Sequence, residues 1–245
     1  MSRAVGGRLP IVAIDGPAGA GKSTLARLVA DRAGYLYIDT GAMYRAVALV
    51  LLRRGWAGSE DVDPAVAGSL AEQLELAFRR EADGQHVLLG DEDVTEAIRA
   101  PEVDRLVPRV AAIGRVRQAL VPRQRALARA GGVVMDGRDI GTEVLPDADF
   151  KFFVTAAFER RVERRCRDLK ARGEVVARDG VAASLAARDA LDQGREVGPL
   201  RQAPGAVLLD TTNLDPDEAA DRILSRCGLC GDQAADGVQP RVPAG

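Results

Sequence analysis

The first fifty residues alternate short apolar runs with longer amphipathic stretches. Residues 11–14 form an uninterrupted apolar run, which is typical of a strand buried on both faces of a sheet. Residues 25–33 carry apolar side chains at helical spacing, residues 35–39 are short and β-prone, and an apolar helix is expected up to about residue 52. The pattern therefore predicts strand, helix, strand and helix in this order.

The pattern changes between residues 58 and 130. Residues 74–78 and 86–89 are β-prone runs, and the Asp-Gly step between them is typical of a hairpin turn. Two arginine-rich helical patterns follow, at roughly 102–113 and 115–130. We expect residues 58–130 to form an insertion, with a small β-containing subdomain followed by these two helices.

The alternation resumes after residue 130. The expected strands are residues 131–136, 151–154 and 207–210, and the expected helices are residues 158–172, 181–193 and 215–226. Strands that alternate with helices predict an α/β fold, with a parallel sheet covered by helices on both faces. Residues 228–245 carry Gly, Pro, Ala and Gln without periodicity, so we expect a disordered tail there.

Composition narrows the class of protein. The 245 residues are 47% hydrophobic, which suits one large or two modest soluble domains, and no apolar run approaches the roughly 18 residues of a membrane-spanning helix. We expect a cytoplasmic protein. The net charge of −2 gives no reason to expect a nucleic-acid or membrane partner.

The cysteines give only a weak signal. Cys227 and Cys230 have the spacing of a metal or redox pair, but only Cys166 and His86 accompany them, so a second pair of ligands is missing. Two tolerated thiols at the start of the tail are the favoured interpretation.

A glycine-rich phosphate loop carries the strongest chemical signal. The first expected strand runs into a Gly-x4-Gly-Lys-Ser sequence that opens a helix. Glycines let backbone N–H groups converge on phosphate oxygens, Lys22 adds a positive charge, and Ser23 can place its hydroxyl on Mg²⁺. The chain is thus expected to have a parallel-sheet P-loop NTPase fold. The predicted ATP-binding residues are Gly16, Pro17, Ala18, Gly19, Ala20, Gly21, Lys22, Ser23 and Thr24.

Other nucleotide-binding classes lack their required residues. A GTPase needs Asn-Lys-x-Asp, but the only asparagine is Asn213 and leucine follows it. A protein kinase needs His-Arg-Asp, whereas valine follows His86. The loop also lacks the Gly-x-Gly-x-x-Gly sequence of dinucleotide-binding folds. A small P-loop kinase or a P-loop ATPase remains.

Two further clusters favour the kinase. Asp39-Thr-Gly-Ala-Met-Tyr-Arg45 and Asp136-Gly-Arg-Asp139 each follow an expected strand, and the carboxyl ends of parallel strands meet at one edge of the sheet. Hydroxyl and guanidinium groups at this edge suit an acceptor phosphate. Each cluster alone is also compatible with a helix cap and a surface arginine.

With these motifs the sequence resembles the bacterial cytidylate kinases from about residue 11 to residue 224. The resemblance extends to Gly114-Arg-Val-Arg117, to Ile140-Gly141 after the second cluster, and to Arg188-Asp-Ala-Leu-Asp-Gln-Gly-Arg195. It implies Mg-dependent transfer of the γ-phosphoryl group of ATP to CMP or dCMP. It further implies a kinase core at residues 9–57 and 131–227, with residues 58–130 as the nucleoside-monophosphate-binding insertion.

The resemblance also implies roles for individual residues. The implied contacts are Thr40, Arg45, Arg138 and Arg195 with the acceptor phosphate, Arg117 and Asp139 with cytosine, and Arg188 and Asp192 with the ribose. A carboxylate can accept from the N4 amino group of cytosine, and a guanidinium can donate to the acceptor edge of the base. By spacing alone, Arg188 and Asp192 could equally pair with each other on one helix face.

The arginine-rich helix at residues 158–172 is expected to belong to a lid at about residues 158–195. Arg161 and Arg165 repeat at one-turn spacing and match the family's Arg-x-x-Arg-Arg segment, so we expect them to close over ATP. A solvated basic helix is the alternative. The residues expected to act in catalysis are Lys22, Arg138, Arg161, Arg165 and Arg195.

One position departs from the family pattern. Nine residues before the base-reading arginine, where the family commonly has serine, this chain has Pro108, which offers neither a hydroxyl nor an N–H donor. This leaves the preference among CMP, dCMP and UMP open, but not the type of reaction.

The remaining expectations concern the metal, the assembly and the alternatives. Mg²⁺ is expected on Ser23, with Asp136 or Asp15 acting through water, and a monomer is expected. A kinase for UMP, AMP or a shikimate-like acceptor is the nearest alternative. A P-loop ATPase or RNA-binding module is the alternative from a different class.

Overall fold

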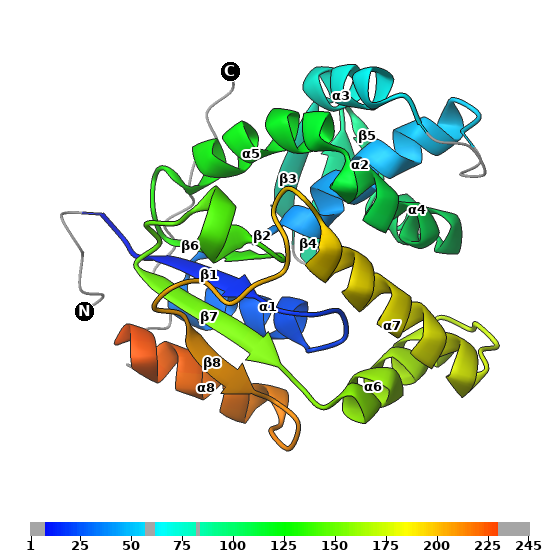
Figure 1. Ribbon diagram of the computed structural model, residues 1–245. Helices are drawn as coiled ribbons and strands as arrows, with labels where there is room; N and C mark the ends of the chain where they lie inside the picture. Colours follow the sequence, from blue (N-terminus) through cyan, green and yellow to red (C-terminus); the bar gives the residue numbers. More distant parts are fainter. Residues whose placement is uncertain (1–7, 57–61, 82–83, 230–245) are drawn as a thin grey trace.

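A parallel sheet forms the centre of the protein. The computed structural model describes residues 8–56, 62–81 and 84–229. Its main sheet has five strands in the order β2-β6-β1-β7-β8, and every neighbouring pair is parallel (Figure 1). The strands are β1 (Ile11–Asp15), β2 (Leu36–Asp39), β6 (Val133–Asp136), β7 (Phe150–Thr155) and β8 (Val207–Asp210).

Helices cover both faces of this sheet, as the sequence pattern predicted. Val12 and Ile14 of β1 pack with α1 (Lys22–Ala33) and α8 (Pro216–Cys227), whereas Ile11 and Ala13 pack on the opposite face with the end of α5. The side chains of a strand point alternately to the two faces, so a fully apolar strand such as β1 requires cover on both. The continuous apolar run at residues 11–14 is explained by this position in the sheet.

The strand register brings the polar strand ends together. Asp136 of β6 pairs with Ile14 of β1 on one side and with Asp39 of β2 on the other. The carboxyl ends of these strands therefore lie at one edge of the sheet. The loop after β1, the start of α2 and the loop after β6 all begin at this edge.

A second body of helices lies at one end of the main sheet together with a small antiparallel sheet (Figure 1). Its helices share one apolar core with β4. The elements are α2 (Thr40–Arg53), α3 (Pro64–Gln73), β3 (Leu76–Glu81), β4 (Gly84–Leu89), β5 (Glu92–Asp93), the 3-10 helix Ala97–Arg99, α4 (Pro101–Ala112) and α5 (Gly114–Ala128). Residues 9–57 were expected to belong to the kinase core and residues 58–130 to the insertion. Helix α2 lies before residue 57 but packs into the core of the second body.

The structure also differs from the sequence prediction in some elements of this body. The hairpin was predicted correctly, but β3 covers Leu76–Glu81 instead of residues 74–78, and β4 begins two residues earlier than expected. Helix α3 and strand β5 were not predicted. The turn was expected within residues 81–85, and residues 82 and 83 of this segment lie outside the described residues.

Two helices that were expected to form the lid pack against the phosphate loop. These are α6 (Phe158–Ala171) and α7 (Arg178–Gly194), and α7 reaches from α6 to α4 (Figure 1). Val162 and Leu169 of α6 pack with Val181 and Leu185 of α7 and with Ala18 of the phosphate loop. The expected lid helices therefore rest on the loop that they were predicted to cover.

The chain end differs from expectation at Cys227. This residue closes α8 with its side chain buried in the apolar core of the main sheet, so it does not belong to a tail. Cys230 and most of the predicted tail lie outside the described residues. In the part of the chain that the structure describes, no helix is long and apolar enough to cross a membrane.

Candidate active site

The phosphate loop is shaped by its glycines. Gly19 and Gly21 adopt left-handed φ values of 74° and 89°, and Gly21 is the N-cap of α1 without any side-chain cap. A side chain at Gly16 would meet the backbone of Val154 in β7. The N-terminal amides of α1 are thus presented towards the cleft, where they favour an anion. Lys22 closes the loop by donating from Nζ to the carbonyl of Pro17 at 2.8 Å.

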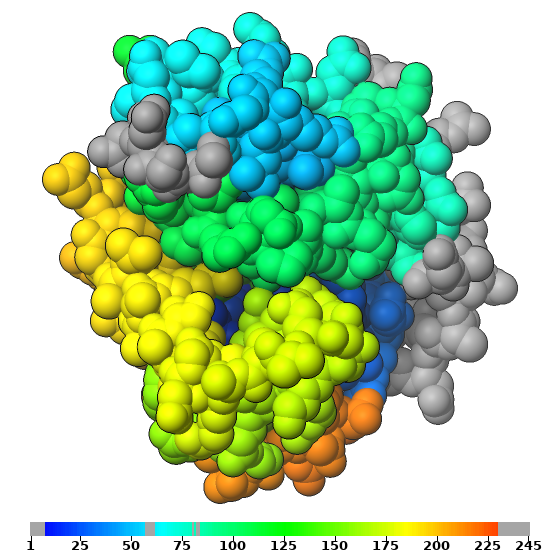
Figure 2. Space-filling view, turned by 90° about the vertical axis from the view of Figure 1, so that its right-hand side faces the viewer, coloured from blue at the N-terminus to red at the C-terminus, as the bar shows by residue number. Residues whose placement is uncertain are grey.

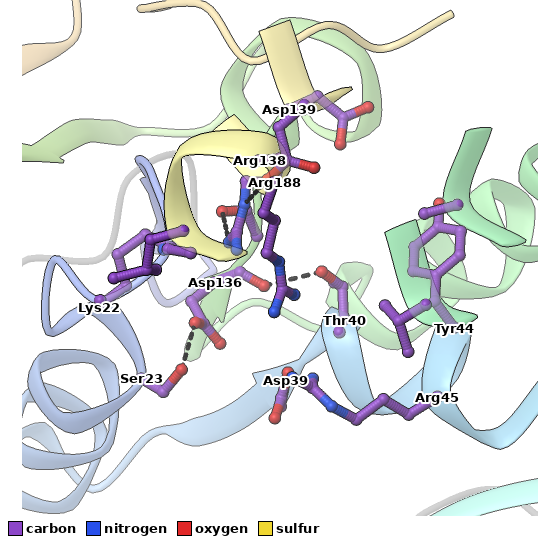
Figure 3. Close-up of a pocket in the computed structure, with 18 of the residues that line it drawn as sticks. Lys22, Ser23, Asp39, Thr40, Tyr44, Arg45, Asp136, Arg138, Asp139 and Arg188 are labelled. Carbon is purple, nitrogen blue, oxygen red and sulfur yellow. Dashed lines mark hydrogen bonds and ion pairs between the residues drawn. The ribbon is translucent and has the colours of Figure 1, made fainter. Parts of the chain in front are cut away.

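Ser23 and Asp136 form a pair of oxygen donors beside this loop. Ser23 Oγ donates to Asp136 Oδ2 at 2.9 Å (Figure 3). Tyr37 donates to the other carboxylate oxygen at 3.0 Å. Burial and the nearby carboxylate of Asp39 raise the pKa of Asp136 to about 6, and burial and Arg138 lower the pKa of Lys22 to about 7. A hydroxyl and a carboxylate side by side are the hard oxygen donors that suit Mg²⁺.

Asp15 does not fit the metal role that was left open for it. Its two carboxylate oxygens accept from the backbone N–H groups of Ile140 and Gly141, at 2.8 and 2.7 Å. It does not line the cleft. Asp15 instead holds the π-helical turn Ile140–Val144, which the sequence pattern did not predict, against the end of β1.

The acceptor-side residues converge on Asp192 and Asp136. Thr40 Oγ1 donates to the backbone carbonyl of Asp136 at 2.8 Å, which fixes the start of α2 beside the end of β6 (Figure 3). Asp192 is buried and accepts from Arg138 Nε at 2.7 Å and from Arg195. The two arginines outweigh the effect of burial and hold the pKa of Asp192 below its usual value. Arg138 and Arg195 are therefore held in position by one carboxylate.

Arg188 differs from its neighbours because no carboxylate among the described residues contacts it. Its Nε is buried without a hydrogen-bond partner in that part of the chain, and its side chain lines the same cleft as Thr40 and Asp136 (Figure 3). Burial, Arg138 and Arg45 lower the pKa of Arg188 to about 9. The alternative in which Arg188 pairs with Asp192 is thus not what the structure shows. Such a guanidinium calls for an anion.

Arg117 and Asp139 form a buried ion pair, and both residues line the cleft. Arg117 also donates to the hydroxyl of Tyr44 at 3.2 Å and lies over its ring. A side chain at Gly198 would meet both charged groups, so the chain after α7 closes over the pair. The two residues expected to read the base are therefore adjacent, and Tyr44 and Gly198 belong to their surroundings.

The arginines of α6 have separate positions. Arg165 lines the cleft, as expected. Arg161 does not: it is buried against the loop, where it donates to the carbonyl of Ala18 at 3.1 Å and to Asp189 at 2.6 Å. Arg164 donates to the backbone carbonyl of Thr211 at 2.6 Å and to that of Ala20 at 3.3 Å. The structure thus gives Arg161 a supporting position behind the phosphate loop, contrary to the expected contact with ATP.

A single cleft joins these groups. Figure 2 shows its opening, where dark-blue atoms of the N-terminal region lie at the bottom between the yellow and yellow-green atoms of α7 and α6 and the green atoms above. Of the predicted residues, the cleft is lined by Ala18, Gly19, Gly21, Lys22, Ser23, Thr24, Thr40, Arg45, Arg117, Asp136, Arg138, Asp139, Arg165, Arg188, Asp192 and Arg195. The predicted residues that do not line it are Asp15, Gly16, Pro17, Ala20 and Arg161.

Several lining residues were not predicted. Asp39 and Tyr44 lie inside the motif at residues 39–45, of which only Thr40 and Arg45 were predicted to contact the acceptor. Val107 and Ala111 of α4 line the cleft one turn apart, and their apolar spacing only indicated a buried helix face. Pro108 lies between them in α4 but does not line the cleft.

Comparisons with known proteins agree with this geometry. A family model described as cytidylate kinase matches residues 12–228. The cytidylate kinase of Symbiobacterium thermophilum is 50% identical over 223 residues, which cover 91% of this chain and 97% of that protein. The cytidylate kinase of Geobacter sulfurreducens is 50% identical over 222 residues, 91% of this chain and 94% of that protein. A bifunctional pantoate ligase/cytidylate kinase of a Synechococcus strain is 48% identical over 219 residues, which cover 89% of this chain and 40% of that protein.

Proposed function

The chain belongs to the cytidylate kinase family, and on that basis we propose that its cleft binds ATP and CMP or dCMP together and transfers the γ-phosphoryl group between them. It is a nucleoside monophosphate kinase. The observation that carries the proposal is the shared cleft, in which a phosphate loop faces a cluster of acceptor-side arginines. A phosphoryl group moving between two nucleotides needs this arrangement of positive charge on both sides.

The phosphate loop is the donor side. The loop amides and the N-terminus of α1 bind the ATP phosphates, and Lys22 adds a point charge beside them. Ser23 and Asp136 would hold Mg²⁺, which when bound neutralises charge on the phosphate oxygens.

The arginine cluster is the acceptor side. A phosphate monoester brings about −2 charge into the cleft. Arg138 and Arg195, oriented by Asp192, supply guanidinium donors for it, as does Arg188, which has no carboxylate partner among the described residues. The negative charge of the bound phosphate favours the charged form of Arg188 and therefore raises its lowered pKa back towards the usual value.

Arg117 and Asp139 are the base-reading pair. Cytosine presents its N4 amino group to a carboxylate acceptor, whereas uracil has a carbonyl there and would set acceptor against acceptor. Such a mismatch supports discrimination of about 10² or more. Pro108 does not line the cleft.

The reaction is an in-line transfer that depends on position and charge, and no enzyme intermediate is formed. Arg165 of α6, which lines the cleft, would stabilise charge on the moving phosphoryl group. Arg161 supports the phosphate loop from behind. Closure of α6 and α7 over the cleft would exclude water, which otherwise competes as an acceptor. We expect a monomer to be sufficient, because one chain supplies both sides of the cleft.

An acceptor panel tests this proposal. ADP release from ATP is measured with CMP, dCMP, UMP, AMP, shikimate or RNA, each against an ATP-only blank. We expect CMP to be used at least about 10²-fold more efficiently than UMP, on the reasoning given for Asp139. A rate with CMP no higher than the blank would contradict the proposal, and stimulation by RNA alone would favour the ATPase alternative.

A further inference from the structure

Asp104 on α4 lies between two arginines from opposite sides of the cleft. Its Oδ1 accepts from Nε and Nη2 of Arg45, both at 3.2 Å, and its Oδ2 accepts from Nη2 of Arg165 at 2.8 Å. Arg45 belongs to α2 on the acceptor side, and Arg165 belongs to the lid helix α6. This carboxylate is a direct connection between the acceptor side and the lid.

The environment of Asp104 keeps the bridge charged. The carboxylate side chain is 14% exposed, and burial alone would raise its pKa. Arg45 and Arg165 outweigh burial and hold the pKa of Asp104 below its usual value. The carboxylate is therefore ionised at neutral pH, and both contacts are charge-assisted.

The bridge orients the two arginines without using all of their donors. A guanidinium has five N–H donors. Within the described residues, Nη1 of Arg45 and both Nε and Nη1 of Arg165 have no hydrogen bond or ion pair, and both side chains line the cleft. Each arginine thus keeps donors for a phosphate while one edge is fixed by Asp104.

We propose that Asp104 is a positioning residue that couples the two nucleotide sites, because it holds an acceptor-side arginine and a lid arginine to one carboxylate. The proposal rests on the function proposed above and assigns a role to a residue outside the cleft lining. Fixing a long arginine side chain costs conformational entropy. Without nucleotide, Asp104 holds only one edge of each guanidinium. The nucleotide that binds first fixes the remaining donors of its own arginine and, through Asp104, restricts the other arginine as well, so the second nucleotide binds to a site that is already arranged.

The test is the coupling ratio, which is the Kd of CMP alone divided by the Kd of CMP with a saturating non-hydrolysable ATP analogue, measured by calorimetry. We expect a wild-type ratio of about 5 or more, the usual lower range of coupling between sites. Asp104→Asn should bring the ratio close to one and lower kcat about tenfold, while the Kd of the ATP analogue alone changes by less than about twofold. Asp104→Glu, which keeps the charge, should retain part of the coupling.

The control is Glu102→Gln on the same helix. Glu102 is exposed and contacts only Arg105 among the described residues, at 3.6 Å, so this change should leave the ratio and kcat at wild-type values. If Asp104→Asn does not fold, Asp104→Ser is measured for the same outcomes. A wild-type ratio of one, or a variant that keeps the wild-type ratio and kcat while only its thermal midpoint falls, would overturn the proposal. Failure of the kinase function itself would appear separately, as wild-type ADP release that does not depend on CMP.

Discussion

At the scale of single residues, function and stability oppose each other at Arg188. Its guanidinium is partly desolvated, lies near Arg138 and Arg45, and contacts no carboxylate in the described part of the chain. A charge in this position costs the folded protein free energy until an anion arrives. Residues of this kind persist because the ligand uses them.

Replacing Arg188 with methionine should separate the two effects. We expect the thermal midpoint of the nucleotide-free protein to stay the same or rise, because a poorly solvated charge is removed. The KM for CMP should rise about 10- to 100-fold, the equivalent of one or two hydrogen bonds to a charged group. Arg178→Met on the same helix is the control, since Arg178 is exposed and pairs only with Glu159 among the described residues. A lower thermal midpoint with an unchanged KM would show that Arg188 is structural.

Asp139 should determine the choice of base. Asp139→Asn keeps the shape of the side chain but adds N–H donors, which can face the O4 carbonyl of uracil. We expect the ratio of kcat/KM for CMP to that for UMP to fall by about 10-fold or more, while the Kd of an ATP analogue stays nearly constant. Steady-state kinetics with both acceptors measures this. Equal losses for CMP and UMP, with weaker ATP binding, would instead assign Asp139 to the phosphate or metal site.

At the scale of elements, the segment after α7 packs against Arg117 and Asp139, the two residues proposed to read the base. The backbone N–H of Leu200 bonds to the carbonyl of Asp192 at 2.8 Å, and Gly198, with a φ of 63°, lies directly against Arg117 and Asp139. Gly205 has a similar φ of 74°, but a side chain there would meet nothing within 4 Å. A side chain at Gly205 would therefore cause backbone strain alone, whereas a side chain at Gly198 would cause the same strain and also contact the two charged groups.

Alanine at each glycine should give different results. Both changes place a Cβ in the left-handed region and should cost about 1–2 kcal/mol of unfolding free energy. Gly198→Ala should also displace the ion pair and raise the KM for CMP at least about tenfold, since a displaced contact to a charged group costs 1.5 kcal/mol or more. Gly205→Ala should leave this KM unchanged. Chemical denaturation and steady-state kinetics measure the two effects, and equal KM values in both variants would contradict the assigned role of Gly198.

Elements with a strong local pattern could be predicted from the sequence. The apolar runs of β1, β6 and β8 and the helical patterns of α4 to α8 were found because burial on both faces or on one stripe dictates the spacing of apolar side chains. Helix α3 and the π-helical turn were missed. The turn is held by the distant carboxylate of Asp15, and such a tertiary contact leaves no periodic signal.

The same limit applies to the site. Lys22, Ser23 and the acceptor arginines were predicted because they lie in contiguous motifs at strand ends, where topology brings them together. Asp104 and Gly198 were missed, since each acts through contacts made only after folding. Arg161 was assigned to ATP by its spacing, but the spacing on α6 could not show that it turns towards the carbonyl of Ala18.

At the scale of the whole molecule, residues of the phosphate loop and strand ends of the main sheet, of the α2–α5 body and of the lid helices line the cleft (Figure 2). Each part contributes positive charge: Lys22 from the loop, Arg45 and Arg117 from the α2–α5 body, and Arg165 and Arg188 from the lid helices. We expect the nucleotides to bring the compensating negative charge and to contact all three parts. The central claim is therefore that this one chain joins a donor and an acceptor nucleotide and passes a phosphoryl group between them.

The most direct test is a product balance. The purified protein is incubated with ATP, Mg²⁺ and CMP, and ADP, CDP and inorganic phosphate are quantified by phosphorus NMR over time. We predict that ADP and CDP form in equal amounts while inorganic phosphate stays at the level of a protein-free blank. ADP that accumulates with an equal amount of inorganic phosphate and without CDP would contradict the account, because it would identify a hydrolase that does not use the acceptor side of the cleft.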